Sequence, residues 1–300
     1  MVKRKVIIVL GPTGSGKSEI ARKIAKDNNG FLIVADSRQI YQEMDIGTNK
    51  DSVTLKRGKY DWNGVEECLV NIVKPNQEYT LDDWLKACKK CINDHPKQLP
   101  VIVGGTGLYI SALVNNYQLG KGFDTKLREK AEKLLKLKGL EYLLSEIKKI
   151  DPEIEHKIES INPRRVLRAY QICSSTKEPL QFEKGESEYE FIQFGMKTDR
   201  EKLYIKLNKR AKEQFDDGLV KEVEALLEKG YKSDSPALSG IGYRNVVKCL
   251  KGEISTEEAI ELNQRDNRRY AKRQMTWFKR DKSINWIENY SEVNSLLNNK

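Results

Sequence analysis

The chain has 300 residues, of which 38% are hydrophobic and 33% are charged, and its formal net charge at pH 7 is +10. This balance is typical of a globular protein that can bury a sizeable core. It excludes a membrane-spanning protein, because no apolar run approaches the ~20 residues that a span needs. We therefore expect a cytoplasmic protein without membrane contact, whose positive charge suits an acidic partner such as a nucleic acid.

The first predicted unit is a buried strand, a glycine-rich loop and a helix. Val6–Val9 is a β-branched run, "SEIARKIA" begins a helix, and the loop between them reads G-x-x-x-x-G-K-S. Its glycines let backbone N–H groups converge on an anion, Lys17 adds a positive charge, and the Ser18 hydroxyl is placed for Mg²⁺. The pattern predicts a phosphate site, without naming the carrier of the phosphate, at Gly11, Pro12, Thr13, Gly14, Ser15, Gly16, Lys17 and Ser18.

Two further strand–helix units follow, within residues 31–41 and 100–114. Strands that alternate with helices predict a parallel sheet with right-handed crossovers. Active groups in such sheets collect at the carboxyl ends of the strands. The first of these strands ends at Asp36, and the second breaks at Gly104–Gly105 before a helix.

Asp36 is the candidate general base, because its strand is expected next to the strand of the phosphate loop. The alternative is a carboxylate that only caps a turn through Ser37 or pairs with Arg38. Thr106 follows the two glycines, and its hydroxyl is expected to point into the same cleft, unless this segment is only a structural turn. A nucleotide hydrolase normally has a Mg²⁺-binding Asp at such a strand end, so Gly-Gly-Thr favours group transfer over hydrolysis.

The cysteines do not form a disulfide framework for a chain of this size; they are Cys68, Cys88, Cys91, Cys173 and Cys249. Cys88-x-x-Cys91 followed by His95 has loose metal-ligand spacing, but no second CxxC completes a tetrahedral site. The surrounding "TLDDWLKACKKCIND" also reads as an amphipathic helix with both thiols on its apolar face. We therefore favour small buried thiols over a metal site.

Residues 124–178 contain no strand candidate and predict a helical insertion. One helix is expected to begin with Asp151 as N-cap, and another with Asn162 as N-cap and Pro163 at its first position. Residues 188–196 alternate like a strand and are expected to rejoin the sheet. We thus predict an α/β core of residues 1–120 and 188–300, with a helical insertion domain of residues 121–187.

Two basic clusters are candidate nucleic-acid contacts. "RRVLR" places three arginines on adjacent helix turns, which is either a solvated face or a contact to phosphates. The segment from Gln264 to Lys282 carries eight cations and two acids, or +6 of the net charge. Tyr270, Gln274 and Trp277 form one helical stripe among these cations. Such a stripe suits single-stranded RNA, although a core stripe with a basic outer face would look similar.

Taken together, the motifs resemble the tRNA dimethylallyltransferases, also called tRNA isopentenyltransferases. The resemblance spans nearly the whole chain, in the family's order, through "GPTGSGKS", "ADSRQIYQEMDIGTNK", "VGGTGLY", "NPRRVLRA", "DREKLYIKLNKR", "GIGYRN" and "AKRQMTWFKR". It implies a P-loop NTPase-like parallel sheet flanked by helices. It also implies transfer of a dimethylallyl group from dimethylallyl diphosphate to the N6 amine of the tRNA adenosine just 3′ of the anticodon.

The resemblance also implies roles for individual residues. The phosphate loop and Arg210 would hold the donor diphosphate with Mg²⁺ at Ser18, Asp36 would bind and deprotonate the amine, and Thr106 would assist. The helical insertion would grip the anticodon stem-loop. The residues expected to contact tRNA are Asp36, Ser37, Arg38, Gln39, Thr106, Arg164, Arg165, Val166, Leu167, Arg168, Gly242, Tyr243, Arg244, Arg269, Lys272 and Arg273.

Two departures and three alternatives accompany this interpretation. "ECLVNIVKP" (67–75) replaces the family's usual His-His-Leu-Ile/Val-Asp stretch, and no zinc-finger tail follows residue 300, so the chain resembles the bacterial members. The alternatives are a small-molecule kinase, a prenyltransferase acting on free AMP, and a non-catalytic RNA-binding protein. A monomer is the default expectation.

Overall fold

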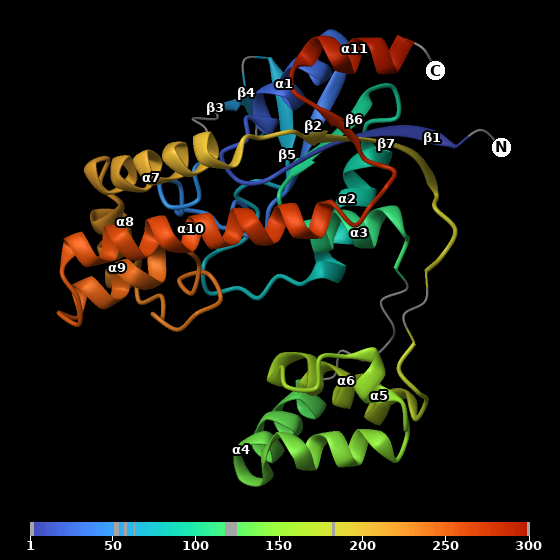
Figure 1. The fold of residues 1–300 in the computed structure, drawn as a ribbon, viewed down its shortest axis with the longest axis vertical. Coiled ribbons are helices and arrows are strands. Elements are labelled where there is room, and N and C mark those ends of the chain that lie inside the picture. The colour runs from blue at the N-terminus through green and yellow to red at the C-terminus, as the bar shows by residue number, and fades with distance from the viewer. Residues whose placement is uncertain are drawn as a thin grey trace. The chain divides into compact units, whose positions relative to one another are not determined.

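The computed structural model describes residues 3–50, 54–56, 59–62, 64–117, 125–181 and 184–298. The chain forms two compact units, a larger one of Met1–Val114 with Ser187–Lys300 and a smaller one of Asn115–Glu186 (Figure 1). The sequence placed the boundaries at 120/121 and 187/188. The first of these lies outside the described residues, and the second lies one residue from the observed division.

A mixed sheet forms the centre of the larger unit. Within the described residues its strand order is β3-β4-β5-β2-β6-β1-β7-β8. The strands from β5 to β8 in this order are parallel, and β3 and β4 extend the sheet as an antiparallel hairpin. The strands are β1 (Arg4–Leu10), β2 (Gly30–Ala35), β3 (Thr54–Lys56), β4 (Lys59–Trp62), β5 (Val65–Cys68), β6 (Leu99–Gly104), β7 (Tyr189–Met196) and β8 (Asn285–Ile287).

The register of the three central strands aligns their carboxyl ends. Gly104 of β6 pairs with Leu10 of β1 on one side and with Ala35 of β2 on the other. Leu10, Gly104 and Ala35 thus lie side by side. The phosphate loop, the segment after β6 and Asp36 each follow directly after one of these three strand ends. The sequence argument had placed the strand of Asp36 beside the strand of the phosphate loop. This was wrong, because β6 lies between them.

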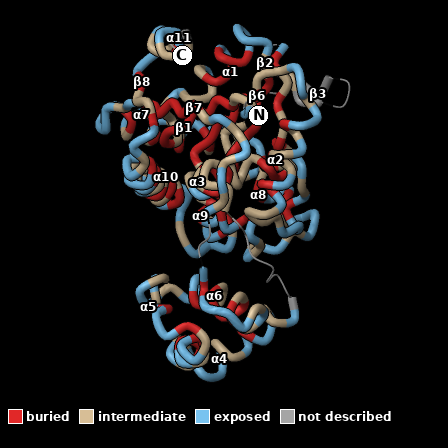
Figure 2. Tube along the Cα trace, turned by 90° about the vertical axis from the view of Figure 1, so that its right-hand side faces the viewer, coloured by how far each residue is buried: buried red, intermediate tan, exposed pale blue. Residues whose placement is uncertain are grey.

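Helices cover both faces of this sheet. Ile24 of α1 and Val293 of α11 share a core with Leu32 and with other strand residues. Phe31 points to the opposite face because side chains alternate along a strand, and there His95, just after α2, stacks on it. Figure 2 shows the buried residues gathered along the strands. The helices of this unit are α1 (Lys17–Asp27), α2 (Leu81–Asp94), α3 (Gly107–Val114), α7 (Arg200–Asp216), α8 (Leu219–Glu228), α9 (Tyr243–Leu250), α10 (Thr256–Phe278) and α11 (Tyr290–Asn298).

The smaller unit is helical, as expected. Its helices are α4 (Thr125–Lys148), interrupted at Gly139, α5 (Ile154–Lys157) and α6 (Pro163–Thr176). Asn162 caps α6 by accepting a hydrogen bond from a backbone N–H, with proline at the first helical position, which confirms that start signal. The N-cap of α5 is Glu153, two residues after the predicted Asp151. The buried Asp151 carboxylate nevertheless accepts a hydrogen bond from the N–H of Glu153 at 3.3 Å, so it caps the turn that leads into α5, and it also accepts from Lys157 and from the N–H of Leu180.

The expected return of the chain to the sheet is confirmed, since β7 pairs in parallel with β1 over its length. The long helical stretch expected after it is two helices, because Gly218 adopts a left-handed conformation with φ 101° between α7 and α8. None of the described helices combines the length and the apolar character that crossing a lipid bilayer requires.

Candidate active site

The phosphate loop joins β1 to α1 in the conformation that its sequence predicts. Gly16 has φ 84° in the left-handed region and is the N-cap of α1, which begins at Lys17. The backbone N–H of Ser15 donates to the carbonyl of Pro12 at 3.2 Å, which closes the turn. The loop therefore presents N–H groups and the positive end of a helix dipole, the usual elements of an anion site.

A cavity of about 1100 Å³ opens beside this loop. Residues of six segments line it: the phosphate loop with the start of α1, the end of β2 with Asp36 and Gln39, the segment Asp45–Lys50, β5 and the residues after it, the end of β6, and the face of α7 that carries Arg210. Predicted donor-site and acceptor-site residues thus share one cavity within the larger unit.

Arg210 is a buried cation placed against the phosphate loop. Its Nη2 donates to the Thr13 hydroxyl at 2.7 Å. Burial lowers the pKa of Arg210 and the charge of Asp36 opposes this effect, but a guanidinium stays charged at neutral pH. Within the described residues, Arg210 Nε and Ser15 Oγ are buried without a hydrogen-bond partner. A buried cation and unsatisfied polar atoms at a phosphate loop fit an anionic ligand.

Asp36 has two distinct carboxylate oxygens. Oδ1 accepts hydrogen bonds from the backbone N–H groups of Arg38 at 2.8 Å and Gln39 at 3.4 Å, so the carboxylate does cap a turn. No hydrogen bond to Oδ2 occurs in the described part of the chain, and Asp36 lines the cavity. The alternative ion pair with Arg38 is not formed, because that guanidinium donates to the carbonyls of Pro236 and Ala237.

Thr106 contacts Ser37, the residue after Asp36, but it is not among the residues that line the cavity, so its expected place in the cleft stays a prediction. Its hydroxyl accepts a hydrogen bond from the N–H of Ser37 at 3.2 Å, and its own N–H donates to the carbonyl of Ala35. Gly104 is required for this approach, because a Cβ there would lie 2.1 Å from the same carbonyl oxygen. The segment is thus a structural turn that also brings a hydroxyl to the residue after the acid.

The stripe on α10 that was expected to meet RNA instead packs against the site. Gln274 is buried; its Oε1 accepts from the N–H of Thr13, and its Nε2 donates to the carbonyl of Gly105, both at 2.9 Å. Burial together with the charge of Asp36 raises the pKa of Tyr270 to about 12, and the nearby Thr106 side chain partly counters this effect. The core-stripe alternative is therefore correct for Gln274, because its buried amide is used up by hydrogen bonds to backbone groups of the two neighbouring loops.

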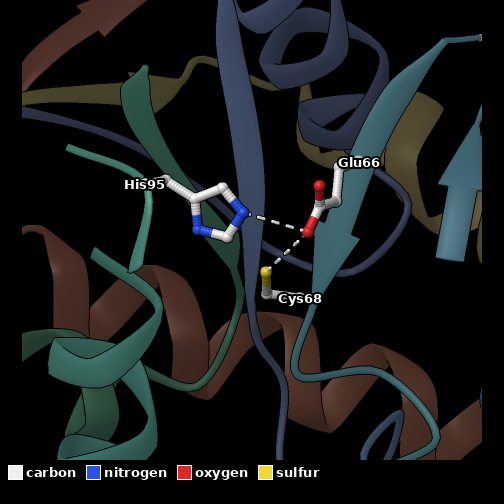
Figure 3. Close-up of side chains that lie close together, drawn as sticks. All are labelled: Glu66, Cys68 and His95. Atoms are coloured by element: carbon white, nitrogen blue, oxygen red, sulfur yellow. Dashed lines mark hydrogen bonds and ion pairs between the residues drawn. The ribbon is translucent and has the colours of Figure 1, made fainter. Parts of the chain in front are cut away.

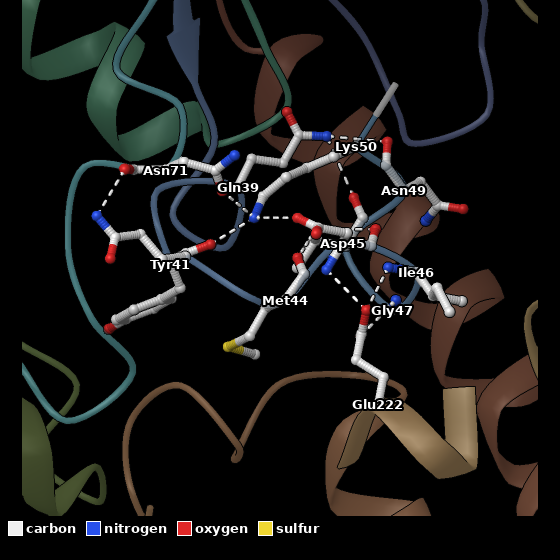
Figure 4. A network of polar contacts seen from close by, with 12 residues as sticks. Gln39, Tyr41, Met44, Asp45, Ile46, Gly47, Asn49, Lys50, Asn71 and Glu222 are labelled. Carbon is white, nitrogen blue, oxygen red and sulfur yellow. Dashed lines mark hydrogen bonds and ion pairs between the residues drawn. The ribbon is translucent and has the colours of Figure 1, made fainter. Parts of the chain in front are cut away.

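A polar network holds the segment after Asp36 (Figure 4). Lys50 donates to Asp45 Oδ1 at 2.9 Å, to the carbonyl of Tyr41 and to the Asn71 side chain. Burial lowers the pKa of Lys50, and the hydrogen bond to Asp45 counters this. Glu222 of α8 accepts from the N–H groups of residues 45 to 47. Sequence reasoning missed both network residues, since neither follows a periodic pattern, although Lys50 ends the motif "DIGTNK".

Three residues expected to contact tRNA are buried structural residues. Tyr243 is 1% exposed and donates its hydroxyl to Glu222 at 2.7 Å. Gly242 is also buried, is the N-cap of α9 and has φ 93°. Val166 is 0% exposed in the core of the smaller unit. Each of the three lies on the inner face of its helix or turn and has a structural role there, so its predicted tRNA contact is not supported by its burial.

Most of the predicted basic contacts have accessible side chains. Arg269, Lys272 and Arg273 are exposed on α10, and Arg164 and Arg165 are exposed on α6. Other members are engaged within the protein. Arg244 pairs with Asp266 at 2.6 Å, Arg168 donates to Gln171, and Leu167 packs beside the core of the smaller unit.

The residues around Ser18 fit a magnesium ion. Ser18 and Glu19 line the cavity in the first turn of α1, as do Lys17 and the carboxylates of Glu213 and Asp217. Hydroxyl and carboxylate oxygens, with ligand phosphates and water, are the groups that Mg²⁺ prefers.

Comparison with known proteins agrees with this geometry. The IPP transferase family model matches residues 39–281. The tRNA dimethylallyltransferase of Acetivibrio thermocellus is 42% identical over 290 residues, covering 94% of this chain and 91% of that protein. The enzyme of the same name from Clostridioides difficile is 40% identical, covering 99% and 96%. The crystal structure of the tRNA isopentenylpyrophosphate transferase of Bacillus halodurans superimposes with a TM-score of 0.71 and 32% identity, covering 99% and 95%. The chain therefore belongs to the IPP transferase family, as do the tRNA dimethylallyltransferases of these clostridia.

Proposed function

We infer that this protein transfers a dimethylallyl group from dimethylallyl diphosphate to the N6 amine of a tRNA adenosine and releases diphosphate. One observation carries this inference: a single cavity has an anion site, formed by the phosphate loop and Arg210, and an acid, Asp36, whose Oδ2 faces no hydrogen-bond donor in the described chain. We assign the first to the donor diphosphate and the second to the acceptor amine.

In this reaction the bond between the allylic carbon and the diphosphate oxygen breaks, and its electron pair leaves with the diphosphate. The backbone N–H groups of the loop, Lys17 and Arg210 stabilise the negative charge of the leaving group. The adenine N6 lone pair forms the new bond to carbon, and Asp36 Oδ2 accepts the N6 proton. Thr106 positions the segment that carries Asp36, because its hydroxyl accepts a hydrogen bond from the N–H of Ser37. Mg²⁺, when bound at Ser18, neutralises part of the diphosphate charge.

The acceptor base must leave the RNA stack to reach this cavity. We assign the adenosine just 3′ of the anticodon, in tRNAs that read codons starting with U, as the target, from the motifs named above. Ser37, Arg38 and Gln39 border its position, and the exposed cations of α10 and of α6 contact the RNA backbone. We expect the enzyme to act in the cytoplasm as a monomer.

Mass spectrometry of modified nucleosides tests the function directly. Unmodified tRNA and Mg²⁺ are incubated with the protein and either dimethylallyl diphosphate or ATP, and the digested nucleosides are weighed. We expect an adenosine heavier by one five-carbon unit with the diphosphate donor alone. Consumption of ATP without this gain would instead establish a P-loop kinase, and modification of free AMP in preference to tRNA would establish a prenyltransferase that acts on AMP.

A further inference from the structure

A cluster of metal-ligating side chains lies on the sheet face opposite α1, outside the cavity described above. Glu66 and Cys68 are two residues apart on β5, so they share one face of the strand. The end of α2 brings His95 to them (Figure 3). Ligand atoms of these three residues all lie within 4.8 Å of one another.

The distances match those of a tetrahedral zinc ion. With Zn–N, Zn–O and Zn–S bonds of about 2.0–2.1, 2.0–2.2 and 2.3 Å, nitrogen and oxygen ligands lie about 3.4 Å apart, and sulfur and oxygen ligands about 3.6 Å apart. The observed separations are 3.1 Å between His95 Nε2 and Glu66 Oε1, and 3.9 Å between Cys68 Sγ and Glu66 Oε1. Small side-chain rotations are enough to reach bonding geometry.

A second thiol lies near the cluster. Cys68 lowers the pKa of the Cys91 thiol, on α2, but the Cys91 sulfur is not one of the ligand atoms that lie within 4.8 Å of one another. Neither cysteine is in a disulfide. Cys88, one helix turn earlier, is fully buried in the core and does not belong to the group. Thiolate, imidazole and carboxylate together form a ligand set typical of Zn²⁺.

His95 is oriented as a metal ligand. Its Nδ1 faces the carbonyl of Cys91 at 2.8 Å, which requires a proton on Nδ1 and leaves the lone pair of the neutral ring on Nε2. That lone pair points at a carboxylate oxygen, and two acceptors at 3.1 Å need a positive centre, either a shared proton or a metal ion. An N–H to carbonyl bond on the second ring nitrogen is the common support of a ligating histidine.

The backbone around the cluster is held in place independently. The Arg4 guanidinium donates to the carbonyls of Ile92, His95 and Gln98 at the end of α2. Phe31 of β2 stacks on the His95 ring with a centroid distance of 4.2 Å. The His95 and Glu66 side chains are only 12% and 22% exposed, so an ion here would be largely shielded from solvent.

We propose that Glu66, Cys68 and His95 bind one Zn²⁺ ion that joins β5 to the end of α2. We assign the ion a structural role, because it links two elements outside the cavity; the fourth position is left to water or to the Cys91 thiolate after a side-chain rotation. The ion fixes the strand that runs directly into Asn71, whose side chain accepts from Lys50 in the network beside the cavity. This site is independent of prenyl transfer, and its test needs no activity measurement.

Metal analysis of the untagged full-length protein tests the proposal. After reduction, incubation with Zn²⁺ and removal of unbound metal, we expect one zinc per chain. With Co²⁺ we expect the charge-transfer absorption of a thiolate–cobalt bond. Cys68→Ser and His95→Gln should each lose nearly all bound metal, and a chelator should lower the Tm of the wild type but not of Cys68→Ser.

Two further variants distinguish the loss of a metal ligand from a general effect of the substitution. Cys249→Ser is the matched control, since this half-buried thiol contacts Thr256 away from the cluster and its loss should leave one zinc per chain. His95→Cys replaces one zinc ligand by another and should retain the metal. No uptake by the reduced wild type, equal uptake by Cys68→Ser, or a Cys68–Cys91 disulfide in place of metal would overturn the proposal.

Discussion

Replacing Asp36 by asparagine separates its role as a turn cap from its proposed role as a general base. Asparagine keeps an oxygen that accepts from the N–H groups of Arg38 and Gln39, at 2.8 and 3.4 Å in the wild type. It removes the carboxylate that we assign to the adenine amine. Alanine removes both functions, and the loss of hydrogen bonds to a charged acceptor costs about 1.5–3 kcal/mol of stability.

The expected loss of activity follows from the role of a general base. Such a group contributes about 10²–10⁴ in rate, or about 2.7–5.4 kcal/mol of transition-state stabilisation. Asp36→Asn should therefore lower the rate of prenyl transfer by this factor, while its Tm stays near that of the wild type. The Kd for tRNA should change less than about tenfold, because contacts to phosphates dominate RNA affinity.

A single-turnover assay with excess enzyme and labelled donor measures this rate without the contribution of product release. Asp36→Ala serves as the comparison, with an equal loss of rate and a lower Tm. An asparagine variant that retains more than half of the wild-type rate would remove Asp36 as the base and leave it as a turn cap. A loss of rate that follows the loss of tRNA binding would instead make it a binding residue.

Three further predictions address α10 and its surroundings. Gln274→Ala leaves the N–H of Thr13 and the carbonyl of Gly105 without their partner, which costs about 1–3 kcal/mol of stability each. Tm should therefore fall and the KM for the donor should rise, and unchanged values would show that Gln274 does not hold the two loops together. Combining Lys272→Ala with Arg273→Ala should reduce the slope of log Kd for tRNA against log salt by roughly 1.4–1.8, if each cation contacts one phosphate; an unaltered slope in a filter-binding titration would exclude this face. Burial raises the pKa of Asp266, but hydrogen bonds from Arg244 and a neighbouring asparagine outweigh burial, so the pKa is lowered from 3.8. The pH-dependent advantage of the wild type over Asp266→Asn should be complete above that value and vanish as pH falls through the lowered pKa, which unfolding curves in an acid series would measure.

Local sequence signals predicted single elements in both units. The phosphate loop of the larger unit lies between a strand and a helix because glycines at fixed positions permit its backbone, and Asn162-Pro163 starts a helix of the smaller unit by capping chemistry that needs no tertiary contact. The strand order could not be predicted in this way. It depends on which strands pack together, and the insertion of β6 between β1 and β2 leaves no trace in their own sequences.

Two other parts of the molecule were missed for different reasons. The antiparallel pair of β4 and β5 lies in the long segment after "DIGTNK", where the Asn-Gly at 63–64 in the sequence is a hairpin signal that could have been used. Gln274 could not have been placed, because a glutamine among cations and aromatic residues fits a core stripe and an RNA-binding stripe equally well. Only the loops that it contacts distinguish the two.

Helix α10 links the parts of the site that the sequence motifs name separately. Its inner face bonds to the phosphate loop and to the segment after β6 through Gln274. Its outer face exposes the cations Arg269, Lys272 and Arg273. Asp36 is on neither of these two loops, but Thr106, in the segment after β6, accepts a hydrogen bond from the N–H of Ser37, the next residue after Asp36. Gln274 therefore links the anion site to the segment that carries the acid, and a change at this one side chain should disturb both parts of the cavity.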